Sequence, residues 1–92
     1  MAVTVTIPTA LRQYAGDNAQ VSAEADTVGA LLRALVELHP NLGRHLFNEQ
    51  GKLRNFVNVY VGDEDIRYLD GEATELRDGE TVSIIPAIAG GF

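Results

Sequence analysis

The segment that most constrains the fold is a single amphipathic stretch, residues 28–36, which lies between segments with the character of strands. Its apolar side chains recur at positions i, i+3, i+4, i+7 and i+8, the spacing that places them on one face of a helix. They are Val28, Leu31, Leu32, Leu35 and Val36. One main helix can cover one face of a sheet, so the pattern predicts an α+β fold whose sheet leaves its second face open.

Both ends of this helix are marked by residues that favour caps and breaks. Asp26 or Thr27 can accept a hydrogen bond from a free backbone N–H at the start. Pro40 and Gly43 are expected to stop the helix. The apolar side chains in the residues that follow are expected to close the edge of the core from an irregular or single-turn segment. They are Leu42, Leu46 and Phe47.

Five segments have the composition of strands. Residues 3–7 alternate apolar and polar side chains before Pro8, and residues 56–61 combine β-branched and aromatic side chains in the strongest strand pattern of the chain. The other three are residues 19–25, the short segment 66–69 after a turn at 62–65, and residues 81–86. We expect a mixed sheet of four to five strands in which the first and last strands pair centrally.

The composition excludes several classes of function. The chain has no cysteine, which rules out disulfides, thiolate metal sites and a cysteine nucleophile. Its net charge of −6 argues against nucleic acid as a partner. No segment has the length of a membrane span or the pattern of a signal peptide, so we expect a cytoplasmic protein without a membrane partner.

Two groups of side chains are of types that bind metals, but they lack a ligand pattern. His39 and His45 flank Pro40 without a nearby ligand set, and positions at the surface or at a helix end are expected for them. The carboxylates of residues 63–65 lack the alternating oxygen ligands of a calcium loop, so a solvated turn is expected. Without a metal constellation or a nucleophile–base pair, the chain is not expected to be an enzyme by itself.

The open face of the sheet is expected to carry an apolar contact surface. The valines of residues 57–61 would face the helix, which leaves Phe56 and Tyr60 on the opposite face. These two aromatic side chains are equally consistent with ordinary cross-strand packing. Ile85 is apolar at an outer position of the last strand, and Ile88 continues the apolar strip. We therefore predict a partner surface formed by Phe56, Tyr60, Ile85 and Ile88.

The chain ends in a diglycine and one aromatic residue, Gly90-Gly91-Phe92, shortly after the last strand. We expect a domain over residues 1–87 and a flexible tail over residues 88–92. Chain ends are commonly small and frayed, which is the simplest explanation of such a tail. Glycine also lacks a Cβ, however, and can pass through narrow channels that other residues cannot enter.

Four passages together carry a family pattern: VTVTIPT at residues 3–9 with Leu11 and Arg12, DTVGA at 26–30, GKLRNFVNVYV with DED at 51–65, and DGETVSIIPAIAGG at 78–91. In this combination they resemble the β-grasp, ubiquitin-like sulfur carriers of the MoaD/ThiS family. Within that family the chain is most similar to the carriers of cysteine biosynthesis. The resemblance covers nearly the whole chain and implies a β-grasp fold.

The resemblance implies a chemical role for the tail. In such carriers the terminal glycine carboxylate, here Gly91, is adenylated by an ATP-dependent enzyme of the ubiquitin-activating type and converted to a thiocarboxylate. Ala89 and Gly90 would thread the partner's site. Phe92 departs from the pattern, because its benzyl group has no room in a channel shaped for glycine. We therefore expect a zinc-dependent JAMM-type peptidase to remove Phe92 and so process the Gly91–Phe92 bond.

The partners implied by the resemblance hold the cofactors. In the cysteine branch the sulfur acceptor is an aminoacrylate on pyridoxal phosphate, held by a partner synthase, while ATP belongs to the activating enzyme, so this chain is expected to bind no cofactor. Three other functions stay open: the small subunit of molybdopterin synthase, a ubiquitin-like modifier joined to lysines, and a β-grasp binding module with an inert tail.

Overall fold

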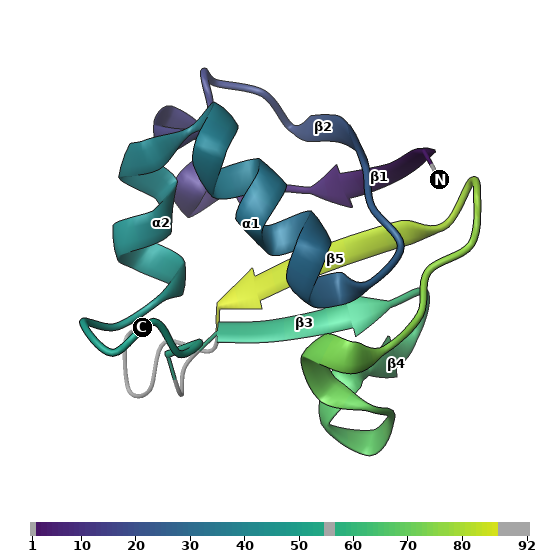
Figure 1. Ribbon diagram of the computed structural model, residues 1–92. Coiled ribbons are helices and arrows are strands. Elements are labelled where there is room, and N and C mark those ends of the chain that lie inside the picture. Colours follow the sequence, from purple (N-terminus) through teal and green to yellow (C-terminus); the bar gives the residue numbers. More distant parts are fainter. Residues whose placement is uncertain (1, 55–56, 87–92) are drawn as a thin grey trace.

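The computed structural model describes residues 2–54 and 57–86, which form a five-stranded sheet with two packed α-helices (Figure 1). The spatial order of the strands is β2-β1-β5-β3-β4. Their bounds are Ala2–Thr6 for β1, Gln20–Glu24 for β2, Val57–Val61 for β3, Glu64–Asp65 for β4 and Thr81–Pro86 for β5. The sheet is mixed, as the sequence pattern predicts.

The first and last strands lie side by side in the middle of the sheet. β1 runs parallel to β5, with Val5 opposite Val82, and antiparallel to β2. On its other side β5 pairs antiparallel with β3, with Val59 opposite Ile84. The predicted central pairing is therefore confirmed, and the C-terminal strand is hydrogen-bonded along both edges.

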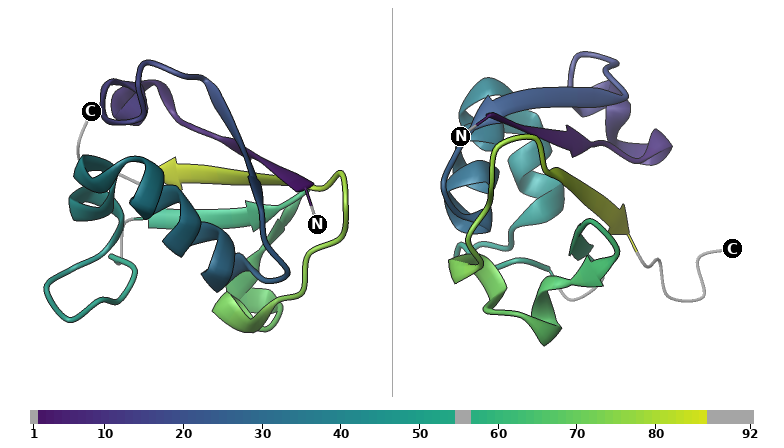
Figure 2. Two further views of the ribbon diagram at one scale, coloured as in Figure 1. Left: turned by 45° about the horizontal axis from the view of Figure 1, so that its top comes forward. Right: turned by 90° about the vertical axis from the view of Figure 1, so that its right-hand side faces the viewer.

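Helix α1, Val28–Leu38, lies on one face of the sheet (Figures 1 and 2). Thr27 caps it, because its side-chain oxygen accepts a hydrogen bond from the Ala30 N–H at 3.2 Å. The predicted stripe is buried at Val28, Leu31, Leu32 and Leu35, and Val36 is half-buried. These side chains meet the inward residues of the strands, which are Val3, Val5, Val57, Val59, Val82 and Ile84.

Helix α1 ends at Leu38, so the predicted stop at Pro40 is confirmed, but the prediction of an irregular or single-turn segment after it is wrong. Pro40 is the first residue of a second helix, α2, Pro40–Leu46. The first position suits proline, because the N–H that proline lacks would have no partner within the helix. Leu42 and Leu46 are fully buried, so α2 adds a second group of side chains to the core beside α1.

The segment after β3 also differs from the prediction. Glu64 and Asp65, expected in a turn, form the short strand β4 through a tight hairpin in which Gly62 has a φ of 61°. Residues 66–69, expected as a strand, begin instead with a 3₁₀ helix, Ile66–Tyr68. The Asp65 side chain accepts a hydrogen bond from the Arg67 N–H at 2.9 Å, which caps this helix and ends the ladder after two residues.

Short 3₁₀ helices lie in the two long connections of the described chain. The first, Thr9–Tyr14, joins β1 to β2 and is followed by a turn in which Gly16 and Asp17 both have positive φ. The second, Gly71–Ala73, precedes β5. Both α-helices lie on the same side of the sheet, and its opposite side is left open over its central strands, as Figure 2 shows.

Candidate functional site

The candidate site is the end of β5, from which the C-terminal residues depart. Val82 and Ile84 point into the core, while Ile85 points to the open face and is 48% exposed. Pro86, the last described residue, lies opposite Val57 of β3. β1 pairs only with residues 81–83 of β5, whereas β3 pairs with β5 up to Pro86, so the end of β5 is held by β3.

All five residues predicted for the tail lie outside the described part of the chain. They are Ile88, Ala89, Gly90, Gly91 and Phe92. Phe56 of the predicted partner surface also lies outside the described residues. The predicted roles of these six residues, and the boundary at residue 87, therefore stay predictions. Of the predicted partner surface, the structure describes Tyr60 and Ile85.

Tyr60 and Ile85 lie on the open face, on neighbouring strands. Tyr60 is opposite Ser83 and Asn58 is opposite Ile85, so Tyr60 and Ile85 are diagonal neighbours of the β3–β5 ladder. Tyr60 is half-buried, whereas Ile85 is one of the large apolar side chains that the described surface exposes. The structure thus brings these two predicted residues together.

The sequence reasoning missed a polar cluster beside them. Asp65, assigned to a solvated turn, has a side chain that is 5% exposed and pairs with Arg67 at 2.7 Å. Arg67 Nε lies 3.2 Å from each Asp65 carboxylate oxygen, and Nη2 also donates to Asn58 Oδ1 at 2.8 Å. Spacing along the chain did not reveal this cluster, because β3 and the hairpin after it supply its members.

The cluster favours the ionised forms of both groups. Hydrogen bonds from the Arg67 side chain, and then from its backbone N–H, hold the pKa of Asp65 below its usual range. The pKa of Arg67 is raised, first by its hydrogen bond to Asp65 and, to a smaller extent, by the nearby Tyr68 and Tyr60. A fixed ion pair therefore lies at the margin of the open face.

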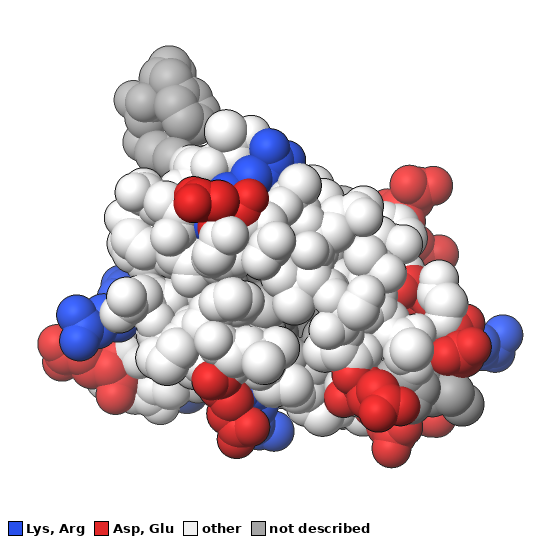
Figure 3. All heavy atoms as spheres, turned by 90° about the horizontal axis from the view of Figure 1, so that it is seen from above, with Lys and Arg blue, Asp and Glu red and all other residues white. Residues whose placement is uncertain are grey.

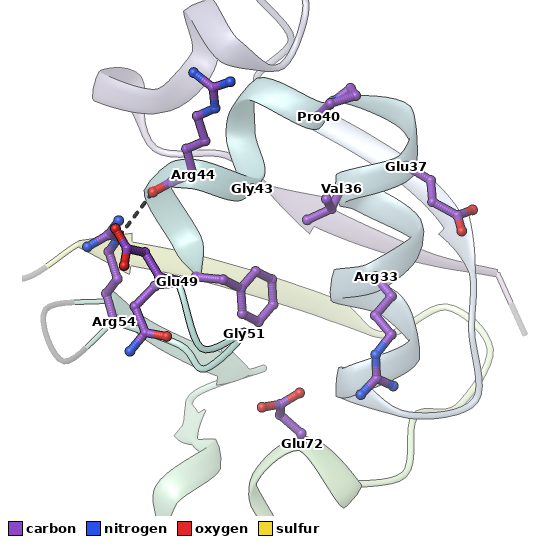
Figure 4. A pocket seen from close by; sticks show the side chains of 12 residues that line it. Arg33, Val36, Glu37, Pro40, Gly43, Arg44, Glu49, Gly51, Arg54 and Glu72 are labelled. Carbon is purple, nitrogen blue, oxygen red and sulfur yellow. Dashed lines mark hydrogen bonds between the residues drawn. The ribbon is translucent and has the colours of Figure 1, made fainter.

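A hollow lies on the helix side of the molecule, between α1, α2 and residues 47–54 (Figure 4). It has a volume of about 830 Å³ and combines an apolar floor with basic and acidic side chains at its rim. Arg54 Nε donates to the Arg44 carbonyl oxygen at 3.0 Å and ties the loop to the end of α2. Basic and acidic side chains are equally numerous at the rim, so the hollow does not favour a ligand of either charge. They are Arg33, Arg44, Arg54, Glu37, Glu49 and Glu72.

The two histidines lie at the ends of the helices. The His45 ring stacks on Tyr14, with centroids 4.0 Å apart, and His39 joins α1 to α2. Within residues 2–54 and 57–86, no group of three or more histidine or acidic side chains could hold a metal ion. Among the same residues, no helix is long and apolar enough to cross a membrane.

Charged side chains are unevenly distributed over the surface. Figure 3 shows one side of the molecule, on which acidic and basic side chains lie around the margin and uncharged side chains fill the middle. Over the whole sequence, 13 acidic side chains outnumber 7 basic ones.

The topology and the tethered C-terminal strand together define a ubiquitin-like β-grasp protein, in which the sheet holds the base of a C-terminal tail. Comparison with known families narrows this class. Residues 5–91 match the ThiS family, and the chain belongs to that family.

Three proteins of known sequence or structure are similar to this chain over nearly its whole length. The chain is 46% identical to the sulfur carrier protein CysO of Mycobacterium tuberculosis, over 99% of this chain and 100% of the relative. A crystal structure of the Amycolatopsis orientalis BexX/CysO complex contains a chain that is 43% identical, with a TM-score of 0.87 over 97% of this chain and 99% of that one. The small archaeal modifier SAMP1 of Haloferax volcanii has a TM-score of 0.86 at 26% identity, over 99% of this chain and 100% of that one.

Proposed function

We propose that this protein is a sulfur carrier whose working terminus is the carboxylate of Gly91, exposed by removal of Phe92. The observation that carries the proposal is the position of β5, which is held between β1 and β3 and ends five residues before Gly91. The similarity to CysO along the full length of both chains supports the same role. The protein would act as a cosubstrate of partner enzymes.

The proposed chemistry needs a terminus that is slender and far from the domain. The carboxylate would attack the α-phosphate of ATP in an activating enzyme, pyrophosphate would leave, and a sulfur donor would then displace AMP to give the thiocarboxylate. From Ala87 to Gly91 the chain can extend by about 17 Å, at roughly 3.3–3.6 Å per residue. Gly90 and Gly91 have no Cβ atoms, and Ala89 has a small side chain, so this segment suits a narrow channel.

Phe92 would keep the carrier inactive until it is removed. A carboxylate on Phe92 would place a benzyl group beside the reacting carbon. Hydrolysis of the Gly91–Phe92 peptide bond, by a zinc peptidase of the JAMM type, would produce the glycine carboxylate. The partner peptidase therefore decides when the carrier can be charged.

The sulfur would pass to a partner synthase. The A. orientalis complex of a CysO with BexX supports the idea that such a carrier docks on a second protein. The similarity to CysO favours a synthase of the cysteine type, in which pyridoxal phosphate holds an aminoacrylate acceptor. ATP and pyridoxal phosphate would belong to the partners, and Tyr60 and Ile85 would form part of the docking surface.

The experiment that tests this function is intact-mass analysis of the protein purified from its native host. We expect a species that has lost Phe92 and, in part of the sample, carries sulfur in place of one terminal oxygen. A variant with Gly91→Ala, purified in parallel, should show no sulfur gain. Adenylation of a chain that retains Phe92 would contradict the proposed processing step.

A second function is favoured by the likeness to SAMP1, whose name describes a modifier. In that case the Gly91 carboxylate would form isopeptide bonds to lysines of other proteins. An immunoblot of host lysate against this protein would then show a ladder of conjugates that disappears when Gly91 is deleted. A single band at the mass of the free carrier would favour the sulfur carrier.

A further inference from the structure

Arg67 is held in one orientation by side chains from two different strands. Its Nε and Nη2 atoms bind the Asp65 carboxylate of β4, and Nη2 also donates to Asn58 of β3. Asn58 lies opposite Ile85 on the open face, so the guanidinium lies at the margin of that face. Its side chain nevertheless stays 65% exposed.

The hydrogen bonds leave one part of the guanidinium unused. Of the five N–H donors of an arginine, those on Nε and Nη2 point to Asp65 and Asn58. Within the described residues, the Nη1 group has no acceptor. A cation whose side chain is already ordered loses little conformational entropy on binding, so its free donors are prepared for an external acceptor.

The surroundings of Arg67 have the composition of a binding hot spot. Tyr60 and Tyr68 lie near enough to influence its charge, and Tyr68 is 85% exposed. Ile85 is the diagonal neighbour of Tyr60 across the ladder. Tyrosine and arginine are enriched among the residues that dominate binding energy at interfaces.

The geometry points to a specific partner contact: Arg67 receives a surface carboxylate of the adenylating enzyme through its free Nη1 donors, beside an apolar group that covers Ile85. The inference rests on the proposed carrier function, which requires such an enzyme. Charge complementarity supports a carboxylate, because Arg67 is a fixed cation on a protein of net charge −6. The contact is expected to help orient docking, because it joins a fixed cation on the open face to a carboxylate of the partner.

The test uses the chain ending at Gly91 and the adenylating enzyme of the native host, with ATP–pyrophosphate exchange as the readout. We expect Arg67→Gln to raise the KM for the carrier by about tenfold or more, the cost of losing a charge-assisted hydrogen bond, with kcat nearly unchanged. Raising the salt concentration should raise the KM of the wild type and affect the variant less. Arg33→Gln, an exposed arginine on the helix side, is the matched control and should behave as the wild type.

Two further variants separate recognition from folding. Asp65→Asn combined with Arg67→Gln removes the cation without leaving a buried carboxylate unpaired, and it should show the same rise in KM. Arg67→Lys keeps the charge but has a single nitrogen in place of the planar guanidinium fork, so it should restore part of the affinity at most. Thermal unfolding of each variant confirms that a folded chain is being compared.

The outcomes distinguish this inference from the function on which it rests. If the wild-type chain supports no exchange, the carrier function itself is wrong. If the wild type is active and the folded variants without the Arg67 cation have its KM and salt dependence, Arg67 serves only to neutralise Asp65 and the inference is overturned. A rise in KM confined to variants that lack the cation supports it.

Discussion

At the scale of single residues, Gly43 decides how closely the two helices approach. A Cβ added at this position would lie 2.9 Å from Val36 Cγ1 of α1, closer than a normal contact. We expect Gly43→Ala to destabilise the protein by about 1–2 kcal/mol, because overpacking outweighs the gain of roughly 1 kcal/mol in helix propensity. Urea unfolding followed by circular dichroism measures this change.

The control for this variant removes the clash from the other side. Val36→Ala in the Gly43→Ala background frees the space that the new methyl group needs. The double variant should therefore be more stable than the sum of the two single changes implies. Strict additivity would show that the contact between residues 36 and 43 is not the cause.

Asp65 is the residue whose ionisation contributes to stability. Its pKa is lowered in the folded state, chiefly by the hydrogen bond from the Arg67 side chain. The contribution is complete above the ordinary carboxyl pKa of about 4 and is lost as the pH falls through the lowered value. We expect the difference in urea midpoint between the wild type and Asp65→Asn to be largest near neutral pH and to close in acid.

Asp63→Asn is the matched control for the pH experiment. Asp63 lies in the same hairpin and is exposed, and no ion pair joins it to the described residues. Its substitution should change the urea midpoint little at any pH. An Asp65→Asn difference that stays constant into strong acid would show that the carboxylate form is not what stabilises the fold.

At the scale of elements, β5 combines a buried and an exposed face in one strand. Val82 and Ile84 fix it in the core, while Ile85 is available to a partner. We expect Ile85→Asp to leave the unfolding midpoint close to that of the wild type but to nearly abolish binding of the activating enzyme, because it places a charge where an apolar contact forms. Pull-down or calorimetric titration with that enzyme provides the measurement.

Thr81→Asp offers a control on the same strand and face. Thr81 is exposed at the opposite end of β5, where it pairs with Thr4. The new charge there should mainly slow association and cost little affinity. Equal, small effects of the two substitutions would place the docking surface elsewhere.

The short elements show where local patterns are ambiguous. Residues 66–69 have the composition of a strand, but the hydrogen bond that the Arg67 backbone N–H donates to the Asp65 side chain favours a 3₁₀ turn. Pro40 reads equally well as the end of one helix and as the first residue of the next. In both cases one residue fits two structures, and contacts made elsewhere in the fold select between them.

At the scale of the whole molecule, we expect the fold and the tail to be separable. Among the described residues, the buried core extends from Val3 to Ile84. Deleting Gly90, Gly91 and Phe92 should therefore leave the urea midpoint unchanged and abolish sulfur loading. Equilibrium unfolding and intact-mass analysis of the same preparation check both parts.

This deletion also tests the simplest explanation of the tail. If the deletion variant still supports its host pathway, the tail is inert and the domain acts through its surface alone. A loss of stability on deletion would instead show that the tail belongs to the folded domain, contrary to the predicted boundary at residue 87.

The sequence by itself determined the elements whose patterns are long and periodic. The stripe from Val28 to Leu35 could bury its face in only one way, and the alternation in β1 and β5 assigned Val82 and Ile84 to the core and Ile85 to the surface. The family resemblance rested on residues 3–12, 26–30, 51–65 and 78–91, which include the diglycine. Periodicity was sufficient here, because it encodes directly which face of an element is apolar.

The tertiary structure alone decided which side chains meet. Asn58, Asp65 and Arg67 form one cluster because β4 folds back beside β3 and then turns away after two residues. Hydrophobic patterning specifies a face but not a partner, and the burial of a carboxylate depends on where the cation that neutralises it comes to lie. The ion pair at the margin of the open face therefore forms only when the strands of the sheet come together, and the sequence alone does not predict it.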